Sequence, residues 1–334
     1  MAKVLISGYY GFKNFGDEAV LSVLTKHLNA LKFDVTVLSG NVDYTEKYHN
    51  VRAVNSFDIK TVIDEIKKCD LLISGGGSLL QDVTSLKSLV YYAFIISLGL
   101  LFNRKVVIFA QGIGPLNRKV SQIIVKNLLK LCSYVSVRDK NSLEILQKWG
   151  INADLVCDPV YSLEVEKKDC KGTLGVQLRD FKTLDTNFLQ KLALFINAKF
   201  SDKNVEIFSL QDSLDYDVCK KFENILLNIN PEIQISVINT NITEKISELE
   251  YLIAMRFHSI LVALKAGVKT CAINYDIKVE QLAKSAGIPL ISMNADENFE
   301  RIYSDLINID SKKLADCDKS FDWKNFDTTV MTAF

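Results

Sequence analysis

Cationic and titratable side chains follow several apolar runs of this sequence at the point where each run ends. Five of them end such a run or lie in the next few residues: Arg138, Arg179, Arg256, His258 and Lys278. If the runs are parallel strands, their carboxyl ends share one edge of a sheet and gather these groups there. A single arginine is more commonly part of a surface salt bridge, but cations placed at random would not favour one end of the strands. The set therefore indicates an anion-binding site, because guanidinium groups bind phosphate and carboxylate through paired hydrogen bonds.

His258 is the histidine best placed for chemistry. It follows Arg256 by two residues in a turn between a predicted strand and a predicted helix. An imidazole with an ordinary pKa of about 6.5 can give or take a proton near neutral pH, which favours an acid/base role. His27 falls on a predicted helix and His49 in a polar loop, so we expect both to be structural or solvated. Neither an Asp-x-Asp motif nor a histidine–carboxylate cluster suggests a metal, and none is predicted.

The first predicted strand is followed by a loop with glycines at positions 8, 11 and 16. This spacing is not that of a dinucleotide-binding loop, and the partial likeness to a phosphate-binding loop fails because Asp17 stands where lysine is needed. A tight turn with Asp17 near the start of a helix is the simpler interpretation. Three glycines together with Asn14 exceed what a turn requires, so Gly11, Asn14, Gly16 and Asp17 are predicted to line a ligand.

Two further loops have the same character. Gly76 and Gly77 lie in a Gly-Gly-Gly-Ser segment after a strand, where the backbone could approach a ligand closely, although a plain strand-to-helix turn explains them equally well. Gln111 ends a strand before Gly-Ile-Gly-Pro, and its amide suits a sugar hydroxyl.

The elements that must position these residues alternate between strand and helix. Continuous apolar runs predict strands at 3–7, 35–38, 71–74, 106–110, 134–137 and 155–156, and again at 173–178, 205–209, 233–237, 251–255, 270–273 and 290–291. Periodic segments between them predict helices. Such runs are typical of parallel sheets covered on both faces. The sequence therefore predicts two doubly wound, Rossmann-like α/β domains that face a cleft, comprising residues 1–163 and 173–310. A charged linker is predicted over 164–172, and a tail over 311–334 is expected to pack back on the first domain.

Composition excludes several classes of protein. The chain has 334 residues, with 40 Lys and Arg against 40 Asp and Glu. This balance argues against nucleic-acid binding, because proteins that bind nucleic acids usually carry an excess of basic residues. Seven cysteines without a Cys-x-x-Cys motif argue for reduced thiols rather than a disulfide framework or a zinc site.

The uncharged stretch 88–103 is too short to span a bilayer. We therefore expect a buried helix packed on a sheet, with a membrane-surface helix as the alternative.

An ordered set of motifs resembles the polysaccharide pyruvyl transferase family, most closely the CsaB type that acts on secondary cell wall polymers. The motifs are Gly8-Tyr-Tyr-Gly11-Phe-Lys-Asn14-Phe-Gly16-Asp17-Glu18, Ser74-Gly75-Gly76-Gly77-Ser78-Leu-Leu-Gln81-Asp82, Gln111-Gly112-Ile-Gly114-Pro115, Val137-Arg138-Asp139, Met255-Arg256-Phe-His258-Ser259 and Tyr275-Asp276-Ile-Lys278-Val279. Each motif alone is weak, but the ordered set, which spans residues 3 to 290, is specific. Ala254 stands where the family often has glycine before Met255-Arg256, a departure that puts little in doubt.

The resemblance implies a GT-B-like fold and transfer of pyruvate from phosphoenolpyruvate to a sugar as a ketal, without a cofactor. The acceptor it implies is N-acetylmannosamine on a lipid-linked or polymeric precursor, and the product would help to anchor S-layer proteins. It implies donor binding by Arg138, Arg256, Phe257 and Lys278, with Arg179 as a weaker candidate. It implies catalytic roles for His258, Arg138 and Lys278, and an acceptor side made of Gly11, Asn14, Gly16, Asp17, Gly76, Gly77 and Gln111.

Two other functions remain open from the sequence. A GT-B glycosyltransferase that uses a nucleotide sugar would have the same architecture, because fold alone does not settle function. A non-catalytic glycan-binding protein is the second alternative, and the presence of Arg256, His258 and Lys278 argues against it. The chain enters a strand at residue 3 without a signal peptide, so we expect a cytoplasmic protein, with peripheral contact at the inner face of the membrane as a further expectation.

Overall fold

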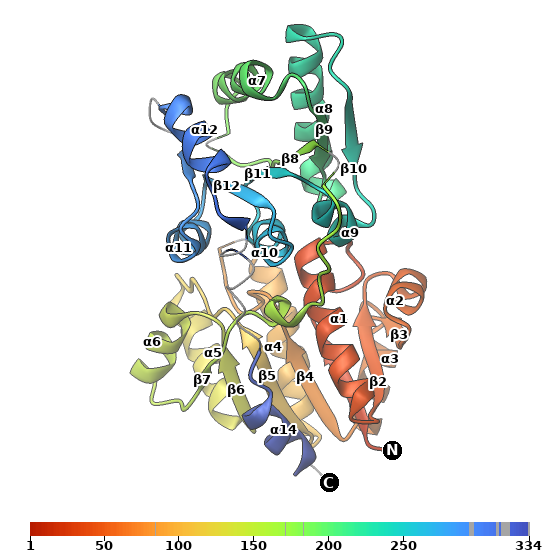
Figure 1. The fold of residues 1–334 in the computed structure, drawn as a ribbon. Helices are drawn as coiled ribbons and strands as arrows, with labels where there is room; N and C mark the ends of the chain where they lie inside the picture. Colours follow the sequence, from red (N-terminus) through yellow and green to blue (C-terminus); the bar gives the residue numbers. More distant parts are fainter. Residues whose placement is uncertain are drawn as a thin grey trace. The chain divides into compact units, whose positions relative to one another are not determined.

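The computed structural model describes residues 1–83, 85–170, 172–182, 184–293, 297–311, 314 and 321–332. The chain divides into two compact units (Figure 1), one comprising Met1–Leu163 and Lys319–Phe334, and the other Glu164–Asp318. The segment 164–172, predicted as a linker, is counted with the second unit, where Lys168 forms an ion pair with Glu244. Of the predicted tail, residues 312–313, 315–320 and 333–334 lie outside the described residues.

The first unit is a seven-stranded parallel sheet in the order β3-β2-β1-β4-β5-β6-β7. Its elements are β1 (Lys3–Ser7), α1 (Phe15–Ala30), β2 (Asp34–Ser39), α2 (Val42–His49), β3 (Arg52–Asn55), α3 (Ile59–Lys68), β4 (Leu71–Gly75), α4 (Leu86–Leu101), β5 (Lys105–Gln111), α5 (Lys119–Leu131), β6 (Tyr134–Val137), α6 (Lys140–Lys148), β7 (Asp154–Leu155), the 3-10 helix η1 (Pro159–Ser162) and α14 (Lys324–Met331). The strand order reverses between β1 and β4. At such a point the loops after the two strands diverge and leave room for a ligand.

Helices cover both faces of this sheet. Leu5, Leu72 and Val106 face a buried apolar cluster that includes residues of α3, α4, α5 and α6. The opposite face carries Phe109, whose ring contacts Phe326 of α14. Phe321 and Trp323 also pack on Phe109, so the described part of the C-terminal segment covers this face.

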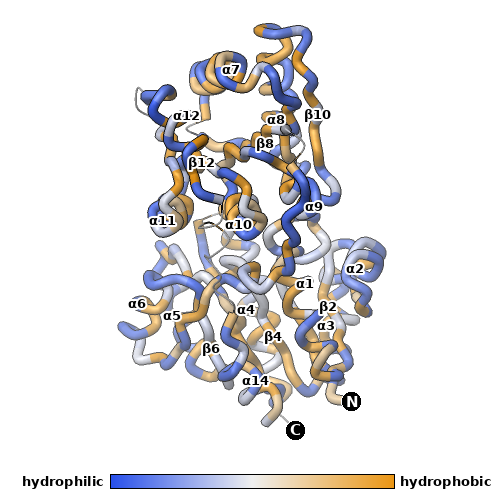
Figure 2. Tube along the Cα trace, in the orientation of Figure 1, coloured by the Kyte–Doolittle hydropathy of each residue, from blue (hydrophilic) through white to orange (hydrophobic). Residues whose placement is uncertain are grey.

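The second unit is a six-stranded parallel sheet in the order β10-β9-β8-β11-β12-β13, which reverses between β8 and β11. Its elements are β8 (Thr173–Gln177), α7 (Thr186–Phe200), β9 (Asn204–Phe208), α8 (Asp212–Ile229), β10 (Ile235–Ile238), α9 (Ile242–Ser247), β11 (Tyr251–Ala254), α10 (Phe257–Lys265), β12 (Lys269–Asn274), α11 (Ile277–Ala286), β13 (Leu290–Ser292) and α12 (Phe299–Ile307). The prediction of two parallel-sheet α/β domains is confirmed, and Figure 2 shows apolar and polar stretches alternating along both units.

Four elements of the first unit were not predicted, namely α2, β3, η1 and α14. β3 at the sheet edge and α2 before it fall within a stretch that the hydropathy pattern leaves without structure. Only two residues of β3 are buried, and α2 is polar on most of its surface, so neither has the apolar run of a central strand or a core helix. Among the described residues, no helix is long and apolar enough to cross a membrane.

Candidate active site

The loop after β1 is fixed by contacts from α1. The Asn14 side chain caps this helix, and its Oδ1 accepts hydrogen bonds from Gly16 N at 3.1 Å and Asp17 N at 3.4 Å. Gly11 has a φ of +80°, and a Cβ there would lie 2.2 Å from Ser39 Oγ. Position 11 therefore requires glycine for both its backbone conformation and its close contact with β2.

A buried acid–histidine pair holds this loop, and the sequence did not indicate it. Gly11 N donates to Glu18 Oε1 at 2.9 Å, and Glu18 Oε2 lies 2.8 Å from His49 Nε2. The His49 and Glu18 side chains are 0% and 3% exposed. His49 Nδ1 lies 3.0 Å from Ser22 Oγ, so both ring nitrogens are engaged. We expected His49 to be either structural or solvated, and its role is structural. It is the last residue of α2, and its side chain is buried in the first unit.

The three glycine-rich loops of the first unit come together. A Cβ on Gly77 would lie 2.8 Å from Asp17 Oδ1, so the carboxylate of the first loop reaches the second. Gly112 N donates to Gly77 O at 2.9 Å, which joins the second loop to the third. The structure thus brings Asp17, Gly77 and the loop after β5 to one place at the carboxyl edge of the sheet.

Gln111 lies beneath these loops, in a place set by an irregularity in β5. The register between β5 and β6 shifts between Ile108 and Gln111, and Ala110 adopts a φ of +47°. Gln111 Nε2 donates to Ser74 O at 3.0 Å and to Ser74 Oγ at 2.8 Å. Its side chain is fully buried and not open to solvent, and through Ser74 it holds the start of the second glycine loop in place.

Three buried polar atoms at this edge have no hydrogen-bond partner among the described residues, and Ser7 Oγ at the end of β1 is the first. The other two are Gln111 Oε1 and the hydroxyl of Tyr10. The Tyr10 ring fills the space beside Gly8 and Gly75, where Cβ atoms would lie 2.3 Å and 2.5 Å from it. Burial, with a smaller effect of the Asp17 carboxylate, raises the pKa of Tyr10 well above its usual value. Buried polar atoms of this kind are usually satisfied, so a ligand or ordered water is expected near them.

Arg138 follows β6 in the first unit and is bound by a residue from later in the chain. Its Nη1 donates to Asp158 Oδ2 at 2.6 Å, and the two side chains are 13% and 4% exposed. Asp158 Oδ1 also accepts a hydrogen bond from Val160 N at 3.1 Å, which fixes the carboxylate. The Arg138 guanidinium is therefore held in one orientation, with its charge largely compensated.

Arg256 follows β11 in the second unit and is held by Asp215 of α8. Arg256 Nε donates to Asp215 Oδ2 at 2.8 Å and Nη2 to Oδ1 at 2.6 Å, a bidentate pair. The Asp215 side chain is fully buried and that of Arg256 is 12% exposed. Burial raises the pKa of Asp215, although the hydrogen bond from Arg256 opposes this shift. The backbone is fixed as well, because Arg256 N donates to Gln177 Oε1 at 2.6 Å.

The remaining predicted residues of the second unit follow three neighbouring strands. Arg179 lies after β8, with its guanidinium 5.8 Å from the centre of the Tyr275 ring. His258 lies in the first turn of α10, after β11, and its ring stands edge-on to that of Phe257. Lys278 lies in the first turn of α11, after β12, where its N–H donates to Asp276 Oδ1 at 2.8 Å. Since β8, β11 and β12 are adjacent, all of these residues lie at one edge of the sheet.

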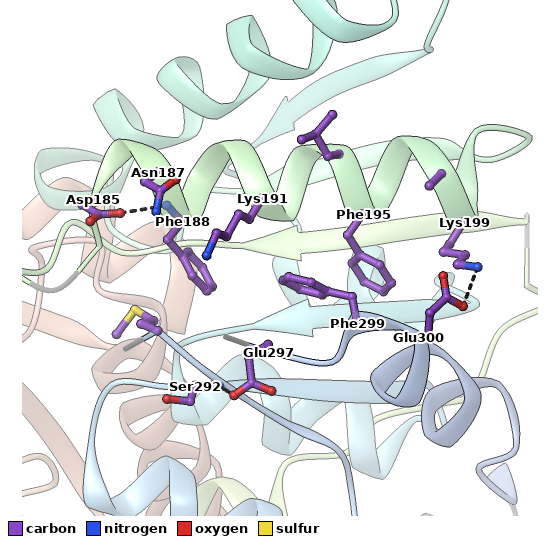
Figure 3. Close-up of a pocket in the computed structure, with 13 residues that line it drawn as sticks. Asp185, Asn187, Phe188, Lys191, Phe195, Lys199, Ser292, Glu297, Phe299 and Glu300 are labelled. Carbon is purple, nitrogen blue, oxygen red and sulfur yellow. Dashed lines mark hydrogen bonds and ion pairs between the residues drawn. The ribbon is translucent and has the colours of Figure 1, made fainter. Parts of the chain in front are cut away.

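A separate cavity of about 490 Å³ lies along α7, between that helix, β13 and α12 (Figure 3). Phe195 and Phe299 stack across it, and Lys199 forms an ion pair with Glu300 at its edge. None of the predicted site residues lines this cavity. Among the described residues, no group of three or more His, Cys, Asp or Glu side chains is arranged to hold a metal ion.

Solved structures of sugar-nucleotide enzymes share the fold. HepE of Anabaena, in complex with UDP-glucose, is similar with a TM-score of 0.66 and 12% identity over 99% of both chains. The UDP-GlcNAc 2-epimerase of Methanocaldococcus jannaschii gives a TM-score of 0.64 at 12% identity, over 95% of this chain and 98% of the epimerase. The epimerase of Neisseria meningitidis bound to UDP-GlcNAc gives 0.61 at 9% identity, over 99% and 100%. At these identities the likeness establishes the GT-B-like fold alone.

The sequence itself identifies the family. A search of curated proteins finds no match. The family model described as polysaccharide pyruvyl transferase matches residues 14–277, which include the end of the first glycine loop, the other two glycine loops, Arg138, Arg256 and His258. This match covers most of the chain and both units, and it indicates a transferase of polysaccharide biosynthesis. The chain belongs to the polysaccharide pyruvyl transferase family.

Proposed function

We propose that the protein transfers pyruvate from phosphoenolpyruvate to two hydroxyl groups of a sugar, forming a ketal and releasing phosphate. The observation that carries this proposal is the group of cations and His258 at the ends of three adjacent strands, in a chain of this family. Phosphoenolpyruvate presents a phosphate and a carboxylate, and such a small, densely charged donor suits a local cationic site in a chain with no net charge.

Arg256 and Lys278 are proposed to hold the donor, together with Arg138 and the ring of Phe257. Asp215 occupies the Nε–Nη2 edge of Arg256, which leaves the Nη1 side to receive an anion. Arg179 is the weaker candidate, because its guanidinium already lies over the Tyr275 ring. Arg138 and Lys278 also act catalytically in this proposal, by stabilising charge on the departing phosphate.

The proposed reaction forms two bonds from sugar oxygens to the enol carbon of the donor and breaks its bond to the phosphate oxygen. One hydroxyl proton is transferred to the methylene carbon, which becomes the methyl group of the ketal, and the other leaves with phosphate. His258 is proposed as the group that moves these protons. Asp17 is the alternative base for a sugar hydroxyl, since it lies among the glycine loops.

The acceptor is proposed to bind at the carboxyl edge of the first sheet, along Gly11, Asn14, Gly16, Gly76 and Gly77, with Gln111 supporting them. By likeness to the CsaB type, the acceptor is N-acetylmannosamine of a lipid-linked or polymeric cell wall precursor, and the product serves to anchor S-layer proteins. The reaction needs no cofactor, and we place it in the cytoplasm, at the inner face of the membrane.

The test is to incubate the purified protein and a synthetic saccharide acceptor with phosphoenolpyruvate or with a UDP-sugar. We expect phosphate release, with an acceptor that gains a pyruvyl ketal by mass spectrometry. A nucleotide-sugar glycosyltransferase is the second candidate, favoured by the fold shared with sugar-nucleotide enzymes. UDP release with a lengthened saccharide, and no phosphate release, would replace our proposal with that one.

A further inference from the structure

Helix α4 has an apolar face that no described part of the chain covers. One side of the helix, including Leu89, Ile95 and Ile96, packs into the core of the first unit. The opposite side carries Leu86, Val90, Phe94 and Leu101, all of which are exposed. Their spacing of four, four and seven residues places them in one stripe. A surface helix normally shows polar side chains there, so this stripe needs a partner to explain it.

Helix α5 repeats the arrangement with added charge. Its core side is formed by Val125 and Leu129. Its exposed apolar residues lie in one stripe: Val120, Ile123, Ile124 and Leu131. At 100° per residue, Lys119, Lys126 and Lys130 all fall beside this stripe on the same flank. An apolar stripe bordered by lysines is typical of helices that lie in the interface of a bilayer.

The two helices present their stripes on the same side of the first unit. Both pack on the sheet face that carries Leu72 and Val106, and they contact each other. Their exposed sides therefore both point away from that face and form one surface, here called the α4–α5 surface. Figure 1 shows α4 beside β4 and β5, with α5 next to it on the side of β6.

The charge of this part of the chain is one-sided. Between Asp82 and Asp139 the sequence has no Asp or Glu, but it has eight basic residues: Lys87, Arg104, Lys105, Arg118, Lys119, Lys126, Lys130 and Arg138. Arg138 is paired with Asp158, which leaves seven that can contribute to the charge of this part of the chain. The whole chain balances 40 cations with 40 anions, so this stretch departs from the overall balance. The Asp82 carboxylate lies at the start of α5, where it accepts hydrogen bonds from Asn117 N and Arg118 N, and the lysines of that helix follow it. A second copy of the same basic surface would be repelled, whereas an anionic lipid surface would be attracted.

We propose that the α4–α5 surface docks on an anionic lipid bilayer, with the apolar stripes entering the headgroup region and the lysines contacting lipid phosphates. α4 follows the loop with Gly76 and Gly77, and α5 follows the loop after Gln111. Docking through these helices would hold both loops near the membrane, where a lipid-linked saccharide is presented. This last step rests on the proposed function, but the docking itself does not.

The test is flotation of the full chain with phosphatidylcholine vesicles that contain or lack phosphatidylglycerol. We expect binding that requires the anionic lipid and weakens in high salt. Phe94→Ser with Ile123→Ser should reduce binding about tenfold, since two exposed apolar side chains lose their burial in the bilayer. Lys119→Gln with Lys130→Gln should reduce it about 25-fold at low salt, at about fivefold for each lysine near the surface.

Matched controls remove similar residues elsewhere. Leu194→Ser with Leu214→Ser removes two exposed apolar residues of the second unit, and Lys32→Gln with Lys47→Gln removes two exposed lysines of the first. Both control pairs should bind vesicles like the unchanged protein.

Binding that is equal for all variants, or no binding to anionic vesicles, would overturn the docking proposal. The unchanged protein could instead sediment as a dimer that does not bind vesicles. If Phe94→Ser with Ile123→Ser then converted this dimer to a monomer, the partner of the surface would be a second copy of the chain. Pyruvyl transfer to a short soluble acceptor should persist in every variant. Its absence from the unchanged protein would count against the proposed function and leave the vesicle result standing.

Discussion

Replacing Asp215 with asparagine tests the site of the second unit most sharply. Asp215 Oδ2 accepts hydrogen bonds from Leu210 N at 3.2 Å, Gln211 N at 3.1 Å and Arg256 Nε at 2.8 Å, while Oδ1 accepts from Arg256 Nη2. An asparagine has one oxygen for these donors. If it faces the two backbone amides, its own NH2 group points at Nη2 of Arg256.

The expected cost follows from this geometry. Asp215→Asn replaces a charge-assisted bond by two facing donors and leaves the Arg256 guanidinium largely buried without its counter-ion. Breaking a buried pair in this way destabilises proteins by about 3–5 kcal/mol. For a unit of this size that corresponds to a fall in Tm of about 6–20 °C. The KM for phosphoenolpyruvate should also rise, because the guanidinium loses its fixed orientation.

Differential scanning calorimetry and donor titration measure the two effects. Glu280→Gln is the matched control, since its ion pair with Lys284 is exposed and should contribute little. Asp215→Asn with Arg256→Met should recover part of the stability but none of the donor binding. An Asp215→Asn protein with the Tm and the KM of the unchanged protein would refute the reasoning.

Three other substitutions test other parts of the account. Gly77→Ala should lower kcat/KM for the acceptor, because the added methyl group would meet the Asp17 carboxylate. Gly150 has a similar φ and nothing within 4 Å, so Gly150→Ala should lower only the stability, by about 1 kcal/mol. Equal kinetics for the two variants would contradict this prediction. Phe326→Ala should lower the unfolding free energy by about 3–5 kcal/mol in urea titration, against little effect of Met331→Ala on the same helix. His258→Ala should reduce kcat by about 10²–10⁴-fold, and full turnover would remove it from acid/base work.

The alternation of strands and helices could be predicted because the central strands are buried on both faces and appear as unbroken apolar runs. Ile6, Leu72 and Ile253 each lie in such a run and are fully buried. The edge strand β3 has no such run, since Arg52 and Asn55 are exposed at its ends.

The candidate site residues could be chosen from the sequence, because strand ends are recognisable and their loops carry glycine and arginine. The residues that hold them could not. Glu18 and His49 are 31 positions apart, and Asp215 and Arg256 are 41 apart. Each pair joins elements that only the folded sheet brings together, and no local pattern marks the partner. Ala110 likewise adopts a conformation that its own residue type disfavours, so the bulge that places Gln111 is a property of the whole sheet.

The central claim is that pyruvate leaves phosphoenolpyruvate and becomes a ketal on a sugar. Its most direct test is NMR of the product formed from donor labelled isotopically at the enol carbon. We predict a labelled quaternary ketal carbon bonded to two acceptor oxygens, with one phosphate released for each ketal formed. A label found only in free pyruvate, or an acceptor extended by a sugar while phosphoenolpyruvate remains intact, would contradict the account.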